Sequence, residues 1–326
     1  MTNEKVTAVP IEDEKVKEWV EHMYSIGEDE LRMIKPYNQV LRKRYMEIHD
    51  DIQNFQTRED DVFICTAPKS GTRWMQEVMW CLRNDCDFEK ANKVPLDFRT
   101  PYIDAKAVAP DGTFTENLVE KISKMEGPRS IKTHLSYDML PKSLREDQIG
   151  KIVSVIRNPR DICASFCHHF KLTDKYTGGV ELLADVYMRD VGPFYGPHFT
   201  NVLSYWSRRE QDNILIVFYE EMKKDLASVI RKIANFLGKE ITNENVAKIV
   251  DFTDIENMKK NPMSNLEERI NMIKRSQNNT EEKGTFINKG KTGGWKTAFT
   301  QETIQRFEEW EKKHLEGTGL AFIYEL

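Results

Sequence analysis

The stretch VFICTAPKSGTRW, residues 62–74, decides the fold. Its apolar run, residues 62–67, predicts a buried strand; the turn PKSG interrupts it, and Thr72 to Asn84 carries apolar residues at helical spacing. A strand that enters a tight loop and then a helix directs several backbone N–H groups and the helix dipole at one point. The segment therefore predicts an anion site, to which Lys69 adds a mobile positive charge, although PKSG alone is also compatible with an ordinary solvated turn between strand and helix.

Two later segments repeat the order of strand and then helix. In the first, KIVSVIR (residues 151–157) is followed by Asn158, suited to a helix cap, by Pro159, suited to the first helical position, and by the helix ICASFCHHF. In the second, NILIVFY (residues 213–219) precedes a helix expected at residues 226–237, which Gly238 ends. Continuous apolar strands that alternate with helices predict a parallel sheet covered on both faces, with ligands at the carboxyl ends of the strands.

We therefore expect an α/β fold, a single domain with a central parallel β-sheet flanked by helices and a phosphate-binding strand-loop-helix. The domain is expected to span residues 1–326, with residues 1–34 as a partly helical or loosely attached extension. Residues up to about Asp60 have a mostly helical pattern, and an amphipathic helix is expected at about residues 302–314.

Composition narrows the class of protein. Of the 326 residues, 39% are hydrophobic and 31% are charged, as in ordinary globular proteins. The net charge of −5 provides no overall basic field, so we expect neither nucleic acid nor a membrane as a partner, and any anion site must be local. The N-terminus lacks a signal-peptide pattern and no stretch approaches the roughly 18 apolar residues of a membrane span, so a cytoplasmic location is expected.

The five cysteines are odd in number and lack zinc-ribbon spacing, which favours reduced thiols. Cys163, Cys167 and His168 lie close enough on one helix to suggest a metal, but buried small residues explain them more simply. We expect no metal.

Three further motifs carry groups suited to phosphate chemistry. In RSIKTHL (residues 129–135), Lys132 and His134 project on the same side of a strand, although a lone histidine is more often structural than catalytic. Arg157 ends its strand and Ser165 follows on the next helix, a pair suited to phosphate, although such an arginine can also form a structural ion pair. The glycine-rich FINKGKTGGWK (residues 286–296) allows close backbone approach, or is an ordinary surface loop.

In this order and spacing, the segments resemble the cytosolic sulfotransferase family. Its hallmarks are a PKSGTTW phosphosulfate loop, a KTH catalytic strand, an arginine-to-serine 3′-phosphate pair and a C-terminal RKGxxGDWK loop. The resemblance covers the chain from about residue 35 onward. It implies 3′-phosphoadenosine 5′-phosphosulfate (PAPS) as the donor, adenosine 3′,5′-bisphosphate (PAP) as the product, and a small-molecule acceptor: a phenol, an alcohol, a sterol-like compound or an amine.

The resemblance also implies residue roles. The catalytic set is His134 as general base with Lys69, Lys132 and Ser165, and the two lysines stabilise negative charge on the transferred group. The donor-binding set is Lys69, Ser70, Gly71, Thr72, Arg73, Trp74, Arg157, Ser165, Tyr219, Thr253, Ile255, Met258, Asn288, Lys289 and Gly290. The acceptor is expected to contact Lys132, His134, Phe166 and His169.

The sequence departs from the family pattern at several positions. Asn288 stands in place of an arginine, and loss of one charge-assisted bond predicts donor binding weaker by about 1.5–3 kcal/mol unless Lys291 compensates. Arg73 in place of threonine and Gly294 in place of aspartate shift the local charge in the positive direction. Ile255 replaces a phenylalanine beside the adenine. The family's dimer signature reads KTAFTQETIQ here, which favours a monomer and leaves a homodimer possible.

Other functions are compatible with the same residues. A small-molecule kinase would need the longer loop that ends in lysine and a carboxylate to hold a metal, and neither is evident. A catalytically weak or inactive protein that binds PAPS or PAP is a second alternative. A third is a dehydratase in which sulfonation activates an alcohol for elimination.

Overall fold

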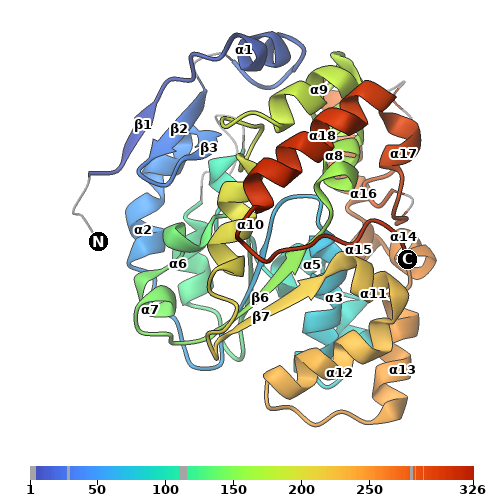
Figure 1. Ribbon diagram of the computed structural model, residues 1–326. Helices are drawn as coiled ribbons and strands as arrows, with labels where there is room; N and C mark the ends of the chain where they lie inside the picture. Colours follow the sequence, from blue (N-terminus) through green and yellow to red (C-terminus); the bar gives the residue numbers. More distant parts are fainter. Residues whose placement is uncertain (1–4, 28–29, 110–115, 280–281, 283, 289) are drawn as a thin grey trace.

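The computed structural model describes residues 5–27, 30–109, 116–279, 282, 284–288 and 290–326 (Figure 1). Its central sheet has four parallel strands in the order β5-β4-β6-β7. These are β4 Val62–Thr66, β5 Ser130–Thr133, β6 Lys151–Ile156 and β7 Ile214–Phe218. The predicted α/β fold, with a parallel sheet and a strand-loop-helix at residues 62–83, is confirmed.

Helices cover both faces of this sheet because successive strand residues point to opposite sides. In β4, Phe63 and Cys65 join one hydrophobic core, whereas Val62 and Ile64 join the other. One face is covered by α8 Pro159–Asp174, α9 Gly179–Tyr187, α10 His198–Trp206 and α18 Gln301–Leu315, and the other by α3 Thr72–Arg83, α12 Leu226–Phe236 and α13 Asn243–Phe252 (Figure 1).

Four helices, α3, α8, α12 and α18, begin close to their predicted positions. At the start of α8, the side chain of Asn158 accepts a hydrogen bond of 2.9 Å from the backbone N–H of Asp161, as a helix cap should. Further helices are α2 His49–Gln53, α4 Phe88–Ala91, α5 Leu96–Arg99, α6 Leu118–Ser123, α7 Lys142–Arg145, α11 Tyr219–Lys224, α14 Ile255–Lys260, α15 Pro262–Asn265, α16 Glu267–Ser276 and α17 Trp295–Ala298. Short 3-10 helices in the described residues are η1 Lys43–Glu47, η2 Ala105–Ala107 and η3 Tyr137–Met139.

The N-terminal region differs from its mostly helical prediction. β1 Thr7–Val9, β2 Leu31–Lys35 and β3 Gln39–Arg42 form an antiparallel sheet, and α1 Glu14–Glu21 lies between β1 and β2. The helical reading was wrong at residues 31–42 because Pro36 cannot donate a backbone hydrogen bond and Asn38 adopts a left-handed conformation (φ 53°), which together form a turn. Trp19 of α1 is fully buried, with its ring 5.5 Å from that of Phe170 on α8.

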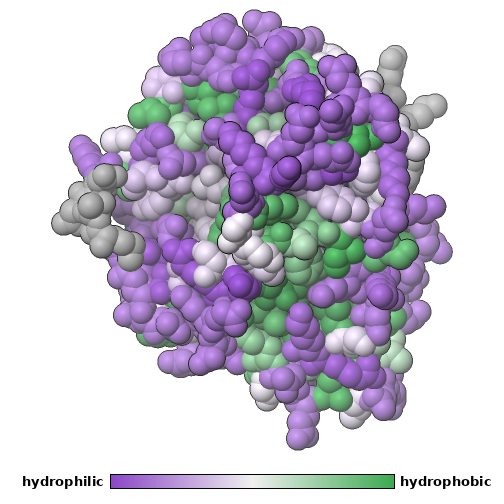
Figure 2. All heavy atoms as spheres, in the orientation of Figure 1, coloured by the Kyte–Doolittle hydropathy of each residue, from purple (hydrophilic) through white to green (hydrophobic). Residues whose placement is uncertain are grey.

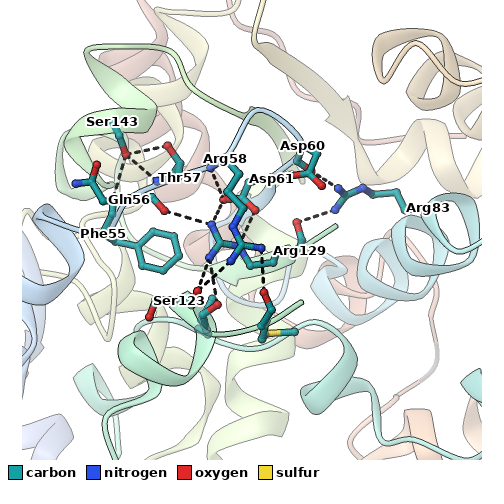
Figure 3. Close-up of polar contacts among 12 residues, drawn as sticks. Phe55, Gln56, Thr57, Arg58, Asp60, Asp61, Arg83, Ser123, Arg129 and Ser143 are labelled. Atoms are coloured by element: carbon teal, nitrogen blue, oxygen red, sulfur yellow. Dashed lines mark hydrogen bonds and ion pairs between the residues drawn. The ribbon is translucent and has the colours of Figure 1, made fainter. Parts of the chain in front are cut away.

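A buried ionic network holds the amino ends of β4 and β5 (Figure 3). Arg129 donates to both carboxylate oxygens of Asp61, and both side chains are almost fully shielded from solvent. Arg129 also donates to the backbone oxygens of Gln56 and Ile122 at 3.2 Å each. This network lies at the end of the sheet opposite to the carboxyl ends, so it supports the strands without entering the site described below.

The face seen in Figure 2 is hydrophilic over its upper part and rim, with apolar side chains gathered in its middle and lower part. Within the described ranges, no helix has the length and apolar character needed to cross a bilayer.

Candidate active site

The loop between β4 and α3 is tightly wound around Gly71. Gly71 caps α3 with φ 90°, and a Cβ there would lie 2.5 Å from the ring of Tyr219, so only glycine fits. Lys69 also has a positive φ of 69°. Ser70 is fully buried and its Oγ has no hydrogen-bond partner among the described residues. The loop thus combines a helix N-terminus with an unsatisfied hydroxyl, the groups that an oxyanion would bind.

Two lysines and an arginine converge on this loop. Burial, together with the charges of Arg157 and Lys132, lowers the pKa of Lys69 to about 7. Burial also lowers the pKa of Lys132 to about 8, although Asp97 opposes the shift. The ammonium groups of Lys69 and Lys132 rest on the rings of Phe286 and Tyr102, at 4.7 Å and 4.0 Å from the ring centroids. Positive charge gathered in a buried space in this way favours an anionic ligand.

His134 follows β5 directly and is 7% exposed. Its Nδ1 lies 2.8 Å from the backbone oxygen of Thr66, so Nδ1 carries the proton and donates it to that oxygen. The Nε2 lone pair is then free to accept a proton. Burial and the charge of Lys132 lower the pKa of His134 well below its usual value, which keeps the ring neutral at pH 7.

Arg157, just after β6, contacts both the loop between β4 and α3 and the C-terminal glycine-rich loop. Its guanidinium donates to the backbone oxygens of Lys69 (2.9 Å) and Lys291 (3.2 Å) and lies 4.3 Å from the centroid of the Tyr219 ring. Its Nε is buried and has no partner in the described part of the chain. The buried carboxylate of Asp161 accepts from the backbone N–H of Gly293 at 2.8 Å, which fixes the C-terminal loop beside Arg157.

An apolar slot adjoins the phosphate loop. The rings of Trp74 and Tyr219 meet edge to face with centroids 5.7 Å apart. Ile255 lies against Gly290, which has φ 58° and whose added Cβ would lie 1.8 Å from the Cδ1 of Ile255. Thr253 is fully buried and donates its hydroxyl proton to the backbone oxygen of Ile249 at 2.7 Å.

One cavity of about 1720 Å³ connects the phosphate loop, the slot and a largely apolar chamber. It is lined by these sequence-predicted residues: Lys69, Gly71, Thr72, Arg73, Trp74, Lys132, His134, Arg157, Ser165, Phe166, His169, Tyr219, Thr253, Ile255, Met258, Asn288 and Gly290. Ser70 is fully buried and is not among the lining residues, and Lys289 falls outside the described residues. The fold therefore brings together nearly all of the residues singled out from the sequence.

Comparison with known proteins identifies the family. The sulfotransferase domain profile matches residues 59–319. Luciferin sulfotransferase from Photinus pyralis is 33% identical over 289 residues, which cover 85% of this chain and 77% of that protein. The protein belongs to the sulfotransferase family. Among solved structures, retinol dehydratase in a complex with retinol and PAP has a TM-score of 0.85 at 25% identity, covering 98% of this chain and 99% of that one. Mouse sulfotransferase SULT7A1 complexed with PAP has a TM-score of 0.67 at 26% identity, covering 86% and 94% of the two chains.

Two departures of this sulfotransferase from the family pattern have structural explanations. Arg73 donates to Asp97 at 2.8 Å and to the backbone oxygen of Ser264 at 2.8 Å. The carboxylate of Asp97 therefore offsets the charge of Arg73, so Arg73 shifts the local charge less in the positive direction than expected. At Gly294, an added Cβ would lie 3.6 Å from the Asp161 carboxylate, so an aspartate there would bring two like charges together.

Several residues of the sulfotransferase site escaped the sequence analysis. Phe286 belongs to the quoted C-terminal motif but was given no role, and Asp97 was not considered. Tyr102, Asp104 and Tyr195 lie beside His134, with the rings of both tyrosines 5.2–5.3 Å from the imidazole. Neither PYIDA nor PFYGP has a periodic pattern that sets these residues apart; the only local clue is that PYIDA lies upstream of the KTH strand.

Proposed function

We propose that this sulfotransferase moves a sulfuryl group from PAPS to the hydroxyl of an apolar small molecule, with His134 as the general base. The observation that carries the proposal is the convergence of Lys69, Lys132, Arg157 and a neutral imidazole on one cavity. Cations recognise the phosphates and sulfate of a donor, and a neutral imidazole accepts the proton of an alcohol.

The unsatisfied groups of the site fit a bisphosphorylated nucleotide. Arg157 Nε, Ser70 Oγ and Trp74 Nε1 are buried without hydrogen-bond partners in the described residues, and each is a donor. Arg157 with Ser165 would hold the 3′-phosphate, the loop from Lys69 to Trp74 the 5′-phosphosulfate, and the slot between Trp74 and Ile255 the adenine. PAPS supplies the sulfuryl group and leaves as PAP.

The residues of this chain act on the acceptor oxygen and the bridging oxygen. Nε2 of His134 takes the hydroxyl proton as the acceptor oxygen attacks, because Nδ1 is already committed to the Thr66 carbonyl. Lys69 and Lys132 stabilise the negative charge that develops on the oxygens around sulfur, and their low-dielectric surroundings strengthen this effect.

The acceptor chamber favours an apolar alcohol or phenol. Phe166, Phe170, Phe194 and Ile273 line it, and α16 contributes to its wall. His169 brings a further neutral imidazole, because burial and Lys69 lower its pKa well below the usual value. We also propose a monomer, because the family's dimer signature reads KTAFTQETIQ in this chain.

A second candidate is dehydration through a sulfate ester. It is favoured by the match to retinol dehydratase over 98% of this chain. In this reaction the sulfated alcohol loses sulfate with the C–O bonding electrons and a neighbouring C–H proton, leaving an alkene.

One experiment tests both candidates. The purified protein is incubated with ³⁵S-labelled PAPS and a panel of androsterone, retinol, 2-naphthol and dopamine, and the products are separated by chromatography. A labelled ester that requires His134 supports transfer, whereas free labelled sulfate together with a dehydrated product supports elimination. PAP binding without either product would contradict both candidates and leave the donor-binding alternative.

A further inference from the structure

Three side chains beside His134 form a hydrogen-bonded chain that ends on a buried carboxyl group. The hydroxyl of Tyr195 lies 2.7 Å from Oδ2 of Asp104, and the hydroxyls of Tyr102 and Tyr195 are 2.5 Å apart. Asp104 is fully buried, and Oδ2 also accepts from the backbone N–H of His134 at 3.3 Å. The chain therefore runs from the cavity wall, which both tyrosines line, to a carboxyl group shielded from solvent.

The direction of proton donation follows from the ionised carboxylate, which can only accept. Tyr195 has one hydroxyl proton and donates it to Asp104, so its oxygen must accept the proton of Tyr102. The oxygen of Tyr102 is then left with a lone pair and no proton to offer. In this series of hydrogen bonds, the Tyr102 oxygen can only accept a further hydrogen bond, such as one from a hydroxyl in the cavity.

Tyr102 lies next to both groups assigned to catalysis. Its ring centroid is 5.2 Å from that of His134 and 4.0 Å from the ammonium nitrogen of Lys132. Its backbone pairs with that of Lys132 in an isolated bridge, which fixes its position beside β5. An acceptor oxygen within reach of His134 is therefore beside Tyr102 as well.

We propose that Tyr102, Tyr195 and Asp104 form a second proton-accepting path for the acceptor hydroxyl, parallel to His134. The inference rests on the proposed sulfuryl transfer. As the acceptor oxygen bonds to sulfur, its proton passes to the Tyr102 oxygen, the Tyr102 proton to Tyr195, and the Tyr195 proton to Asp104. The bond between sulfur and the bridging oxygen breaks with its electron pair on PAP. Three O–H bonds break and three form, and Asp104 ends as a neutral acid that loses its proton to water by the reverse path.

The titration of these groups suits such a path. Burial raises the pKa of Asp104 to about 6, against hydrogen bonds from Thr133 and Tyr195, so the group is ionised at pH 7 and able to take a proton. Burial raises the pKa of both tyrosines well above the usual value, so each carries its proton. The titratable and charged groups that face Asp104 from the surrounding elements are Tyr45, Cys65, Tyr102, Lys132, His134, Tyr195 and Tyr205.

The test compares Tyr102→Phe in two backgrounds, wild type and His134→Ala, using androsterone or whichever alcohol of the panel is turned over fastest. Phenylalanine keeps the ring against His134 and Lys132 and removes only the hydroxyl. With two parallel paths, Tyr102→Phe lowers kcat by about 3-fold in wild type and about 30-fold in His134→Ala. The His134→Ala variant also loses activity as the pH falls through about 6, where Asp104 takes up a proton. This loss of activity at low pH disappears in His134→Ala/Asp104→Asn.

Tyr205→Phe is the matched control. Its hydroxyl donates to the backbone oxygen of Leu135 at 2.5 Å. Tyr205 is thus a buried phenol close to the end of β5 that takes no part in the hydrogen bonds between Tyr102, Tyr195 and Asp104. Tyr205→Phe is expected to change kcat by the same factor in wild type and in His134→Ala. Equal effects of Tyr102→Phe in both backgrounds, or a His134→Ala rate that is flat down to pH 5, would overturn the relay and leave the transfer assignment intact. A wild-type protein that sulfonates no member of the panel would instead overturn the proposed function.

Discussion

Gly290 offers a sharp test of the proposed adenine slot, because alanine at this position has no room. The glycine has a left-handed φ of 58°, and an added Cβ would lie 1.8 Å from Cδ1 of Ile255. The Gly290→Ala variant must therefore hold alanine in a disfavoured backbone conformation and move the side chain that forms one wall of the slot.

The two costs can be estimated separately. A non-glycine residue in the left-handed region costs about 1–2 kcal/mol. Displacing the end of a packed isoleucine costs about 1–3 kcal/mol, as other overpacking substitutions do. Together they predict PAP binding weaker by about 2–5 kcal/mol, or roughly 30- to 5,000-fold.

Calorimetric titration with PAP measures this loss, and Gly293 provides the control. Gly293 lies in the same loop with φ 78°, but an added Cβ there meets nothing within 4 Å, so Gly293→Ala incurs only the backbone cost. Adding Ile255→Ala to Gly290→Ala is expected to recover the part due to the clash. Equal losses for Gly290→Ala and Gly293→Ala, or no recovery in the double variant, would refute the packing of Gly290 against Ile255.

Three further predictions concern charge. An anion beside Lys69 raises its pKa above the ligand-free value of about 7, so PAP binding should take up a proton and weaken as the pH rises from 7 to 9. In Lys69→Arg, which does not titrate there, this dependence should shrink to the smaller part that Lys132 contributes with its pKa of about 8; an undiminished dependence would contradict the assignment. Asn288→Arg should tighten PAP binding about 10- to 150-fold by restoring a charge-assisted bond, and an unchanged dissociation constant would count against that reasoning. Arg129→Met leaves the buried carboxylate of Asp61 unpaired and should lower the free energy of unfolding in urea by about 3–5 kcal/mol, whereas a loss below about 1 kcal/mol would mean that the pair contributes little.

The sequence allowed the core of the fold to be predicted because its signals are local. The apolar run before PKSG, the cap at Asn158 and the stop at Gly238 each act within a few residues, and the structure has a strand or a helix end at each. The N-terminal strands were missed because they are short and their pairing depends on the turn between Lys35 and Gln39. Such a turn carries little periodic signal.

Most residues that line the cavity could be singled out from the sequence because they occur in compact motifs, whereas the groups beside His134 depend on contacts that are distant along the chain. Asp104 and Tyr195 are 91 positions apart, and only the fold brings them together. The ion pair of Arg73 could not be predicted for the same reason, because its partner Asp97 is 24 positions away and nothing in the loop at residues 67–71 indicates it.

The most direct test of the central claim measures PAP binding and sulfuryl transfer side by side in wild type and His134→Gln. If the cations bind the donor and the imidazole takes the proton, PAP should bind both proteins with dissociation constants within about 3-fold, while kcat with an alcohol acceptor falls by about 10²- to 10⁴-fold in the variant. Wild-type protein that fails to bind PAP, or a variant that transfers sulfate as fast as wild type, would contradict the account.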